Sequence, residues 1–168
     1  MKYLFQDTLD YVLNLFSGLK TAAVYYLQDL KKEDEVSRKD FAASYQEAKT
    51  SFALLMAGAY MKEHDDAVML FYDSEFGSPQ SYFEAFGIDT DRVLHTPITD
   101  VEQLKFDLVG QLDNIERGDK VIIVIDSIGN LASKKELEDA LNEKGVADMS
   151  RAKALKGLFR MVTPYLTM

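Results

Sequence analysis

The sequence contains no cysteine and only two histidines, His64 and His95, which lie far apart in the chain. The absence of cysteine excludes disulfide bonds and metal sites with thiolate ligands. Two histidines at distant positions do not predict a histidine-based metal centre. His64 closes a helical pattern, where a cation is stabilised by the helix dipole.

Long apolar runs are missing as well, since no stretch approaches the roughly 20 residues that span a bilayer. Residues 1–7 already contain an acidic side chain, and no small-residue cleavage site follows. We therefore expect no membrane partner, no signal peptide and a cytoplasmic location.

Basic residues are in deficit, with 19 Lys and Arg against 28 Asp and Glu, a formal net charge of −9. This balance argues against nonspecific binding to nucleic acid, which depends on neutralising phosphates. A local basic face is still compatible with it.

What is present predicts two parts, a helical N-terminal segment over residues 1–35 and an α/β core over residues 36–168. Apolar side chains recur every three or four positions from Met1 to Leu30, as in an amphipathic helical hairpin. Such a hairpin covers part of a core or forms a dimerisation or partner-docking face. The charged segment Lys31–Glu35 is expected to be a linker.

In the second part, strands alternate with helices, which predicts a small, mostly parallel sheet flanked by helices. Strands are expected at 67–72, 93–98 and 121–125. Helices are expected at 37–64, 80–86, 100–115, 134–142 and 148–162, with Asp100 as an N-cap. Several apolar side chains are expected in the core. They are Phe41, Tyr45, Phe52, Leu55, Met56, Ala59 and Tyr60 on the long helix, and Phe71, Phe76, Phe83, Phe86 and Phe159 elsewhere.

The segment Val121–Ile125 consists of five consecutive β-branched apolar residues. Such a run predicts a strand that is covered on both faces. It ends on Asp126 and Ser127, at the carboxyl edge where open α/β sheets bind ligands. In nucleotide-hydrolysing P-loop proteins a carboxylate here helps to hold magnesium. The pattern alone also fits a purely structural strand.

Five motifs along the chain resemble the UvsX-type phage homologues of the RecA recombinase. The similarity extends from about Lys49 to Met168 and leaves the first 48 residues unmatched. The motifs are Leu70–Gly77, Arg92–Pro97, Ile125–Glu136, Asp139–Glu143 and Leu158–Pro164. The resemblance implies a partial RecA-like core.

This family comprises ATP-dependent recombinases that form filaments on single-stranded DNA and exchange strands. By resemblance, ATP and magnesium are the cofactors, and Glu75 is the catalytic residue that orients the attacking water. Asp126 is the Walker B carboxylate, followed by Ser127. Lys49 and Thr50 correspond to the end of the P-loop, so that Thr50 and Asp126 ligate magnesium.

The resemblance also implies a contact with single-stranded DNA near Arg151, Lys153, Lys156 and Arg160, in a region that includes the first DNA-facing loop of the family. Helical spacing places Lys153, Lys156 and Arg160 on one side, with Arg151 off that line. An ordinary solvated helix face is the alternative interpretation.

The sequence departs from its family before Lys49. A P-loop needs glycines and a preceding buried strand, whereas residues 41–48 contain no glycine and consist mostly of helix formers. The sensor strand and second DNA loop of the family are also not found before Met168. We therefore predict a continuous helix over residues 44–50 and a chain that is inactive or nearly inactive as a DNA-dependent ATPase.

The sequence leaves three interpretations of the function open. The first is the inherited recombinase activity, or at least nucleotide and DNA binding. The second is a non-enzymatic module that binds a protein partner, such as a full-length recombinase or a second copy of this chain. The third is a decayed or engineered product without independent activity.

Overall fold

The computed structural model describes residues 35–141 and 149–165, with side chains from residue 43 onward. The chain divides into two compact units, Met1–Ser51 and Phe52–Met168, and the sheet lies in the second. The hairpin expected from Met1 to Leu30 and most of the expected linker lie outside the described residues.

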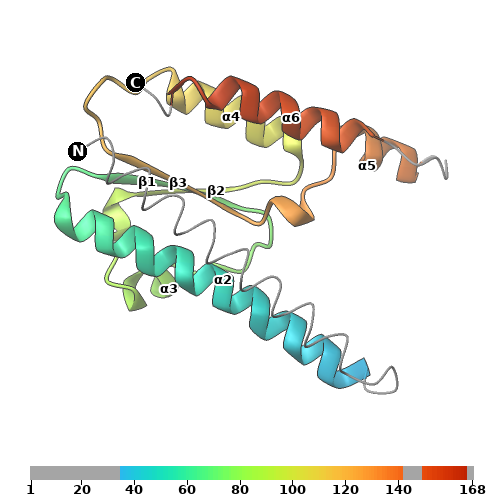
Figure 1. Ribbon diagram of the computed structural model, residues 1–168, viewed down its shortest axis with the longest axis horizontal. Helices are drawn as coiled ribbons and strands as arrows, with labels where there is room; N and C mark the ends of the chain where they lie inside the picture. Colours follow the sequence, from blue (N-terminus) through green and yellow to red (C-terminus); the bar gives the residue numbers. More distant parts are fainter. Residues whose placement is uncertain (1–34, 142–148, 166–168) are drawn as a thin grey trace. The chain divides into compact units, whose positions relative to one another are not determined.

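Three parallel strands form the sheet in the order β2-β1-β3, which confirms the predicted α/β class (Figure 1). The strands are β1 (Val68–Asp73), β2 (Val93–Pro97) and β3 (Val121–Asp126). Their register pairs Asp73 with Pro97 on one side and with Asp126 on the other. The carboxyl ends of all three strands therefore meet at one edge of the sheet.

Helices cover both faces of this sheet (Figure 1). The helices are α2 (Glu35–Glu63), α3 (Gln80–Ala85), α4 (Val101–Leu112), α5 (Lys134–Leu141) and α6 (Ser150–Val162), with short 3₁₀ helices η1 (Thr90–Arg92) and η2 (Ile128–Asn130). On one face α4 and α6 lie side by side, while the last turns of α2 pack on the other face with α3. Asp100 caps α4 as predicted, because its side chain accepts a hydrogen bond of 2.7 Å from the Gln103 amide.

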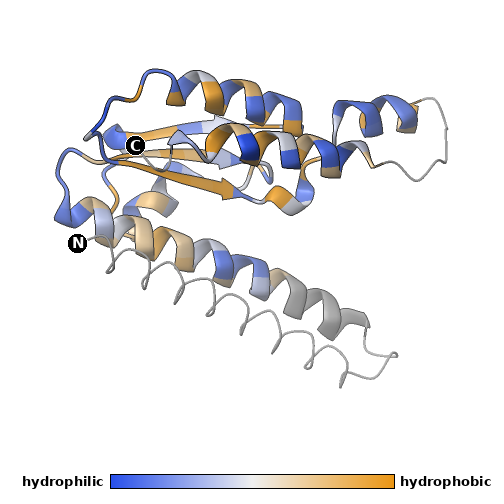
Figure 2. Cartoon of the chain, turned by 45° about the horizontal axis from the view of Figure 1, so that its top comes forward, coloured by the Kyte–Doolittle hydropathy of each residue, from blue (hydrophilic) through white to orange (hydrophobic). Residues whose placement is uncertain are grey.

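The central strand β1 is apolar on both faces because each face has its own hydrophobic cluster. Leu70 and Tyr72 belong to the cluster under α4 and α6, and Met69 and Phe71 belong to the cluster under α2 and α3. Figure 2 shows the corresponding apolar colouring along the strands. Alternation in a strand sends successive side chains to opposite faces, so a continuous apolar run is required here.

The expectation for β3 needs one refinement. Its side chains do contact both clusters, with Ile123 and Ile125 on one face and Ile122 and Val124 on the other. All six residues are nevertheless half-buried, because β3 lies at an edge of the described sheet. The strand that is almost fully buried is β1.

Within its last turns, α2 turns a different face to the sheet than the one predicted. Leu54, Ala57 and Met61 are buried at i, i+3 and i+7, whereas Leu55 and Met56 are 56% and 39% exposed. The apolar residues around Leu54 are compatible with more than one buried helix face. Packing against the sheet determines which of these faces is buried.

Two of the expected core phenylalanines were also placed wrongly. Phe71 and Phe83 are buried and contact each other edge to face, with ring centroids 4.9 Å apart. Phe76 and Phe159 are 63% and 49% exposed. Phe76 follows the strand in a loop, at a backbone φ of 55°, where its side chain leaves the sheet.

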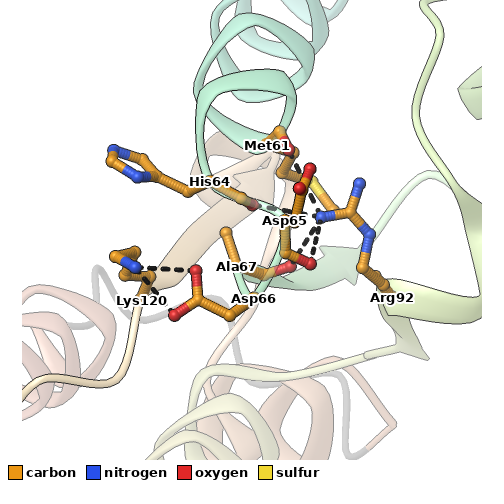
Figure 3. Close-up of polar contacts among 7 residues, drawn as sticks. All are labelled: Met61, His64, Asp65, Asp66, Ala67, Arg92 and Lys120. Carbon is orange, nitrogen blue, oxygen red and sulfur yellow. Dashed lines mark hydrogen bonds and ion pairs between the residues drawn. The ribbon is translucent and has the colours of Figure 1, made fainter.

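At the amino edge of the sheet, Arg92 completes the hydrogen bonding of the turn between α2 and β1 (Figure 3). The carbonyl groups at the end of a helix lack partners within the helix. The Nη1 atom of Arg92 lies between 3.1 and 3.4 Å from four carbonyl oxygens at the end of α2 and in the turn after it, which share its two hydrogens: those of Met61, His64, Asp65 and Ala67.

The same figure shows a second cation at this edge, on the loop that enters β3. Lys120 Nζ lies 2.7 Å from both carboxylate oxygens of Asp66. The Lys120 carbonyl also accepts a hydrogen bond of 2.9 Å from the Val68 amide. This pair thus joins the loops that precede β1 and β3.

None of the helices in the described part of the chain combines the length and apolar character needed to cross a bilayer.

Candidate functional site

The ends of β1 and β3 are joined through two serines. The Ser74 amide donates to the Asp126 carbonyl at 2.8 Å, and the Ser127 amide donates to Ser74 Oγ at 2.8 Å. Ser74 Oγ in turn donates to the Ser127 carbonyl at 2.9 Å. The peptide bond between Asp126 and Ser127 is cis. The three hydrogen bonds join the two strand ends.

Asp73 organises the loop that follows β1. Its side chain is almost fully buried, and its Oδ1 atom accepts hydrogen bonds from the amides of Glu75, at 2.9 Å, and Phe76, at 2.7 Å. Its Oδ2 atom accepts from the Ser78 amide at 3.3 Å and lies 3.2 Å from His95 Nε2. This pattern of a carboxylate bonding to amides further along its own chain is typical of Asx turns.

The loop places the Glu75 carboxylate over the end of β3. Glu75 Oε1 accepts hydrogen bonds from Ser127 Oγ at 3.2 Å and from Asn130 Nδ2 at 2.9 Å. The structure therefore brings Glu75 and Ser127 into contact, with Asp126 next in the chain. Side chains held by several hydrogen bonds are pre-positioned for chemistry or binding.

Sequence reasoning missed three residues of this edge, namely Asp73, His95 and Asn130. All three lie within the motifs Leu70–Gly77, Arg92–Pro97 and Ile125–Glu136. The available signal was that both β1 and β3 end on Asp, since parallel strand ends lie next to each other. The pairing of Asp73 with Asp126 follows from that register.

Lys49 and Thr50 lie inside α2, in the compact unit Met1–Ser51, whereas Glu75, Asp126 and Ser127 belong to the unit Phe52–Met168. The Lys49 ammonium lies 5.4 Å from the centre of the Tyr45 ring, one turn earlier on the helix. That spacing is typical of i, i+4 neighbours on a helix surface.

The segment before Lys49 does not fit a triphosphate. Helix α2 runs from Glu35 to Glu63 without a break, and there is no glycine between Gly18 and Gly58. Inside a helix each amide donates to the carbonyl four residues earlier, so these amides cannot converge on phosphate oxygens. Over the described ranges, no three His, Asp or Glu side chains cluster as metal ligands either.

The four basic residues of α6 separate into two groups. Arg151 Nη2 donates to the carbonyls of Ile128, at 3.0 Å, and Gly129, at 2.7 Å, so its guanidinium holds η2. Its Nε atom is buried without a hydrogen-bond partner. Lys153, Lys156 and Arg160 are exposed. The accessible basic groups of α6 are therefore these three residues and not Arg151.

A search against models of protein families finds no match. Among curated proteins, the chain is similar to a "Recombination and repair protein" of Enterobacteria phage T4, with 60% identity over 119 residues. The match covers 71% of this chain and 30% of the relative, so the chain spans less than a third of that protein's length. The identity supports a relationship of the matched segment to a phage recombination and repair family.

Proposed function

We propose that this chain is part of a UvsX-type recombinase core that acts in phage recombination and repair without hydrolysing ATP itself. One observation carries the proposal. The carboxylate edge around Glu75 and Asp126 is intact, whereas Lys49 and Thr50 lie within a continuous helix.

Phosphoryl transfer in P-loop enzymes needs both halves of the site. One half positions water and magnesium, the roles that the resemblance gives to Glu75 and Asp126, and the other cradles the phosphates. Without glycine-rich backbone ahead of Lys49, a triphosphate has no cradle. Glu47, two positions before Lys49, adds a negative charge that repels phosphate.

The test is ATP turnover with magnesium and single-stranded DNA, together with calorimetric titration of ATP. We expect no turnover above that of Glu75→Gln and no measurable heat of binding. The T4 relative, assayed in parallel, controls for the conditions. Turnover that disappears in Glu75→Gln would overturn the proposal.

A second function, weak contact with single-stranded DNA, is favoured by the placement of Lys153, Lys156 and Arg160. Their exposure on one side of α6 leaves them accessible to phosphates. We expect Lys156→Gln to lower the affinity for a labelled oligonucleotide in fluorescence anisotropy. It should also reduce the slope of log affinity against log salt by about one. Lys62→Gln, which removes a charge from α2, is the matched control and should change neither value.

The alternative is a module that binds a full-length recombinase. Light scattering of this chain mixed with the T4 relative tests it, and the expected result for this alternative is a complex heavier than either protein alone. Two separate species at low salt would exclude it.

A further inference from the structure

The outer surface of α4, on the side away from the sheet, carries an exposed apolar patch. Phe106 is 86% exposed, and beside it Met161 of α6 is 41% exposed. Together with Val109 and Gly110 they line a shallow depression of about 680 Å³. Large apolar side chains gathered on a surface, rather than scattered singly, mark sites of interaction.

At Gly110 no side chain projects into this depression. A glycine inside a helix costs about 1 kcal/mol relative to alanine. A Cβ atom at Gly110 would have no neighbouring atom within 4 Å, so packing within the chain does not require a glycine there. Its absence of a side chain therefore leaves room for a group from outside, next to Phe106.

Acidic side chains surround the patch. Glu102, Asp107 and Asp113 line it, against the one basic lining residue Lys105. Glu102 accepts a hydrogen bond of 3.0 Å from the Lys134 amide, and Asp107 accepts one of 2.8 Å from the Tyr72 hydroxyl. Asp113 accepts one from the Tyr165 hydroxyl. Because these carboxylates are already fixed, they lose little side-chain entropy when a partner binds.

The chain itself carries a surface of the complementary chemistry. On α6, the exposed Lys153, Lys156 and Arg160 lie beside Phe159, which is 49% exposed. This surface is basic with an aromatic group, as the acidic and apolar face of α4 requires. At 3.6 residues per turn, the basic residues from Lys153 to Arg160 extend along about two turns and the segment from Glu102 to Asp113 along about three, so the two lengths are compatible.

Because α4 and α6 lie side by side in one layer, a two-fold axis can bring α4 of one copy onto α6 of another and the reverse (Figure 1). We propose that the outer face of α4 and α6 is a self-complementary interface through which two copies of this chain form a dimer. The inference is independent of nucleotide chemistry. Single-stranded DNA and the second copy would compete for the same basic residues on α6.

Sedimentation equilibrium of the full chain at low and high salt tests the proposal. We expect a dimer at low salt that dissociates as salt screens the charges. Gly110→Arg should weaken association by about tenfold or more, because it puts bulk and positive charge opposite Lys156 and Arg160. Gly110→Ala is the matched control: it adds one methyl group and no charge, so it should weaken association much less than Gly110→Arg, and both variants should keep the wild-type circular dichroism spectrum.

A charge exchange provides the decisive comparison. Lys156→Glu should also weaken the dimer, and combining it with Gly110→Arg should restore association, because the two reversed charges then attract across the interface. A monomer at all salt concentrations would overturn the proposal. So would assemblies larger than dimers, association unaffected by Gly110→Arg, or a monomer that binds a Lys- and Leu-rich helical peptide through α4.

Discussion

The two edges of the sheet complete their backbone hydrogen bonds with groups of opposite charge. At the amino edge the Arg92 guanidinium meets four carbonyl oxygens. At the carboxyl edge the Asp73 carboxylate meets three amides and His95. The amino edge satisfies the end of a helix, while the carboxyl edge builds a loop that presents Glu75. Asp73 is therefore the residue that organises the loop at the carboxyl edge.

The strongest test of this difference is Asp73→Ala. Three loop amides would lose a charged acceptor, and we expect a loss of about 3 kcal/mol in the free energy of unfolding. Urea denaturation measures it. Glu75→Ala, in the same loop, is the control and should change stability by about 0.5 kcal/mol or less. Equal losses in both variants would show that Asp73 does not organise the loop.

At the opposite edge, Arg92→Met should cost about 2 kcal/mol, because the carbonyl oxygens at the end of α2 lose a cationic donor. The same denaturation experiment applies. Arg92→Lys keeps the charge but not the planar guanidinium, so its loss should be intermediate. A variant as stable as the wild type would mean that water replaces Arg92 at no cost, and the two edges would then differ in strength.

One residue before Asp73, on the other face, Tyr72 donates to Asp107 at 2.8 Å. Tyr72→Phe should cost about 1 kcal/mol at neutral pH. Burial raises the pKa of Tyr72 above its ordinary value of 10.0, and the hydrogen bond to Asp107 acts in the same direction. The folded state thus favours the protonated phenol. This contribution is complete below pH 10 and is lost as the pH rises above it, so the wild type and Tyr72→Phe should converge there.

The smallest effect is expected for the exposed pair of Lys120 and Asp66. The hydrogen bond from Lys120 lowers the pKa of Asp66, so the pair contributes above the ordinary pKa of that carboxylate and stops contributing as the pH falls. Lys120→Met should change the urea midpoint slightly at low salt and not at all at high salt. A salt-independent loss as large as that of Arg92→Met would contradict this.

The sequence was sufficient for the order of strands and helices in the core, because the apolar runs are long and each loop carries turn residues. It was not sufficient for the helix face of α2, where Leu54, Leu55 and Met56 are all apolar and packing chooses among them. Nor could it separate Phe71, which lies inside a strand, from Phe76, which follows it by one short loop.

For the candidate site, the motifs located Glu75, Asp126 and Ser127 at one edge, but they did not assign partners. The hydrogen bond between Glu75 and Asn130 joins residues that only the strand register brings together. The contact of Arg151 with the carbonyl groups of η2 was only weakly indicated in the sequence, because Arg151 lies off the helical line of Lys153 and Lys156. A loop carbonyl acceptor leaves no trace in sequence, because every residue type has one.

Gly58 limits which changes of length the last turns of α2 can accept. A Cβ atom at Gly58 would lie 2.8 Å from the Phe86 carbonyl oxygen, closer than packing allows. Any residue other than glycine at this crossing would therefore push α2 away from the end of α3. Insertion or deletion of one residue between Phe52 and Gly58 would turn the helix by about 100° and put a side chain at this crossing, so the last turns of α2 tolerate changes of residue type better than changes of length.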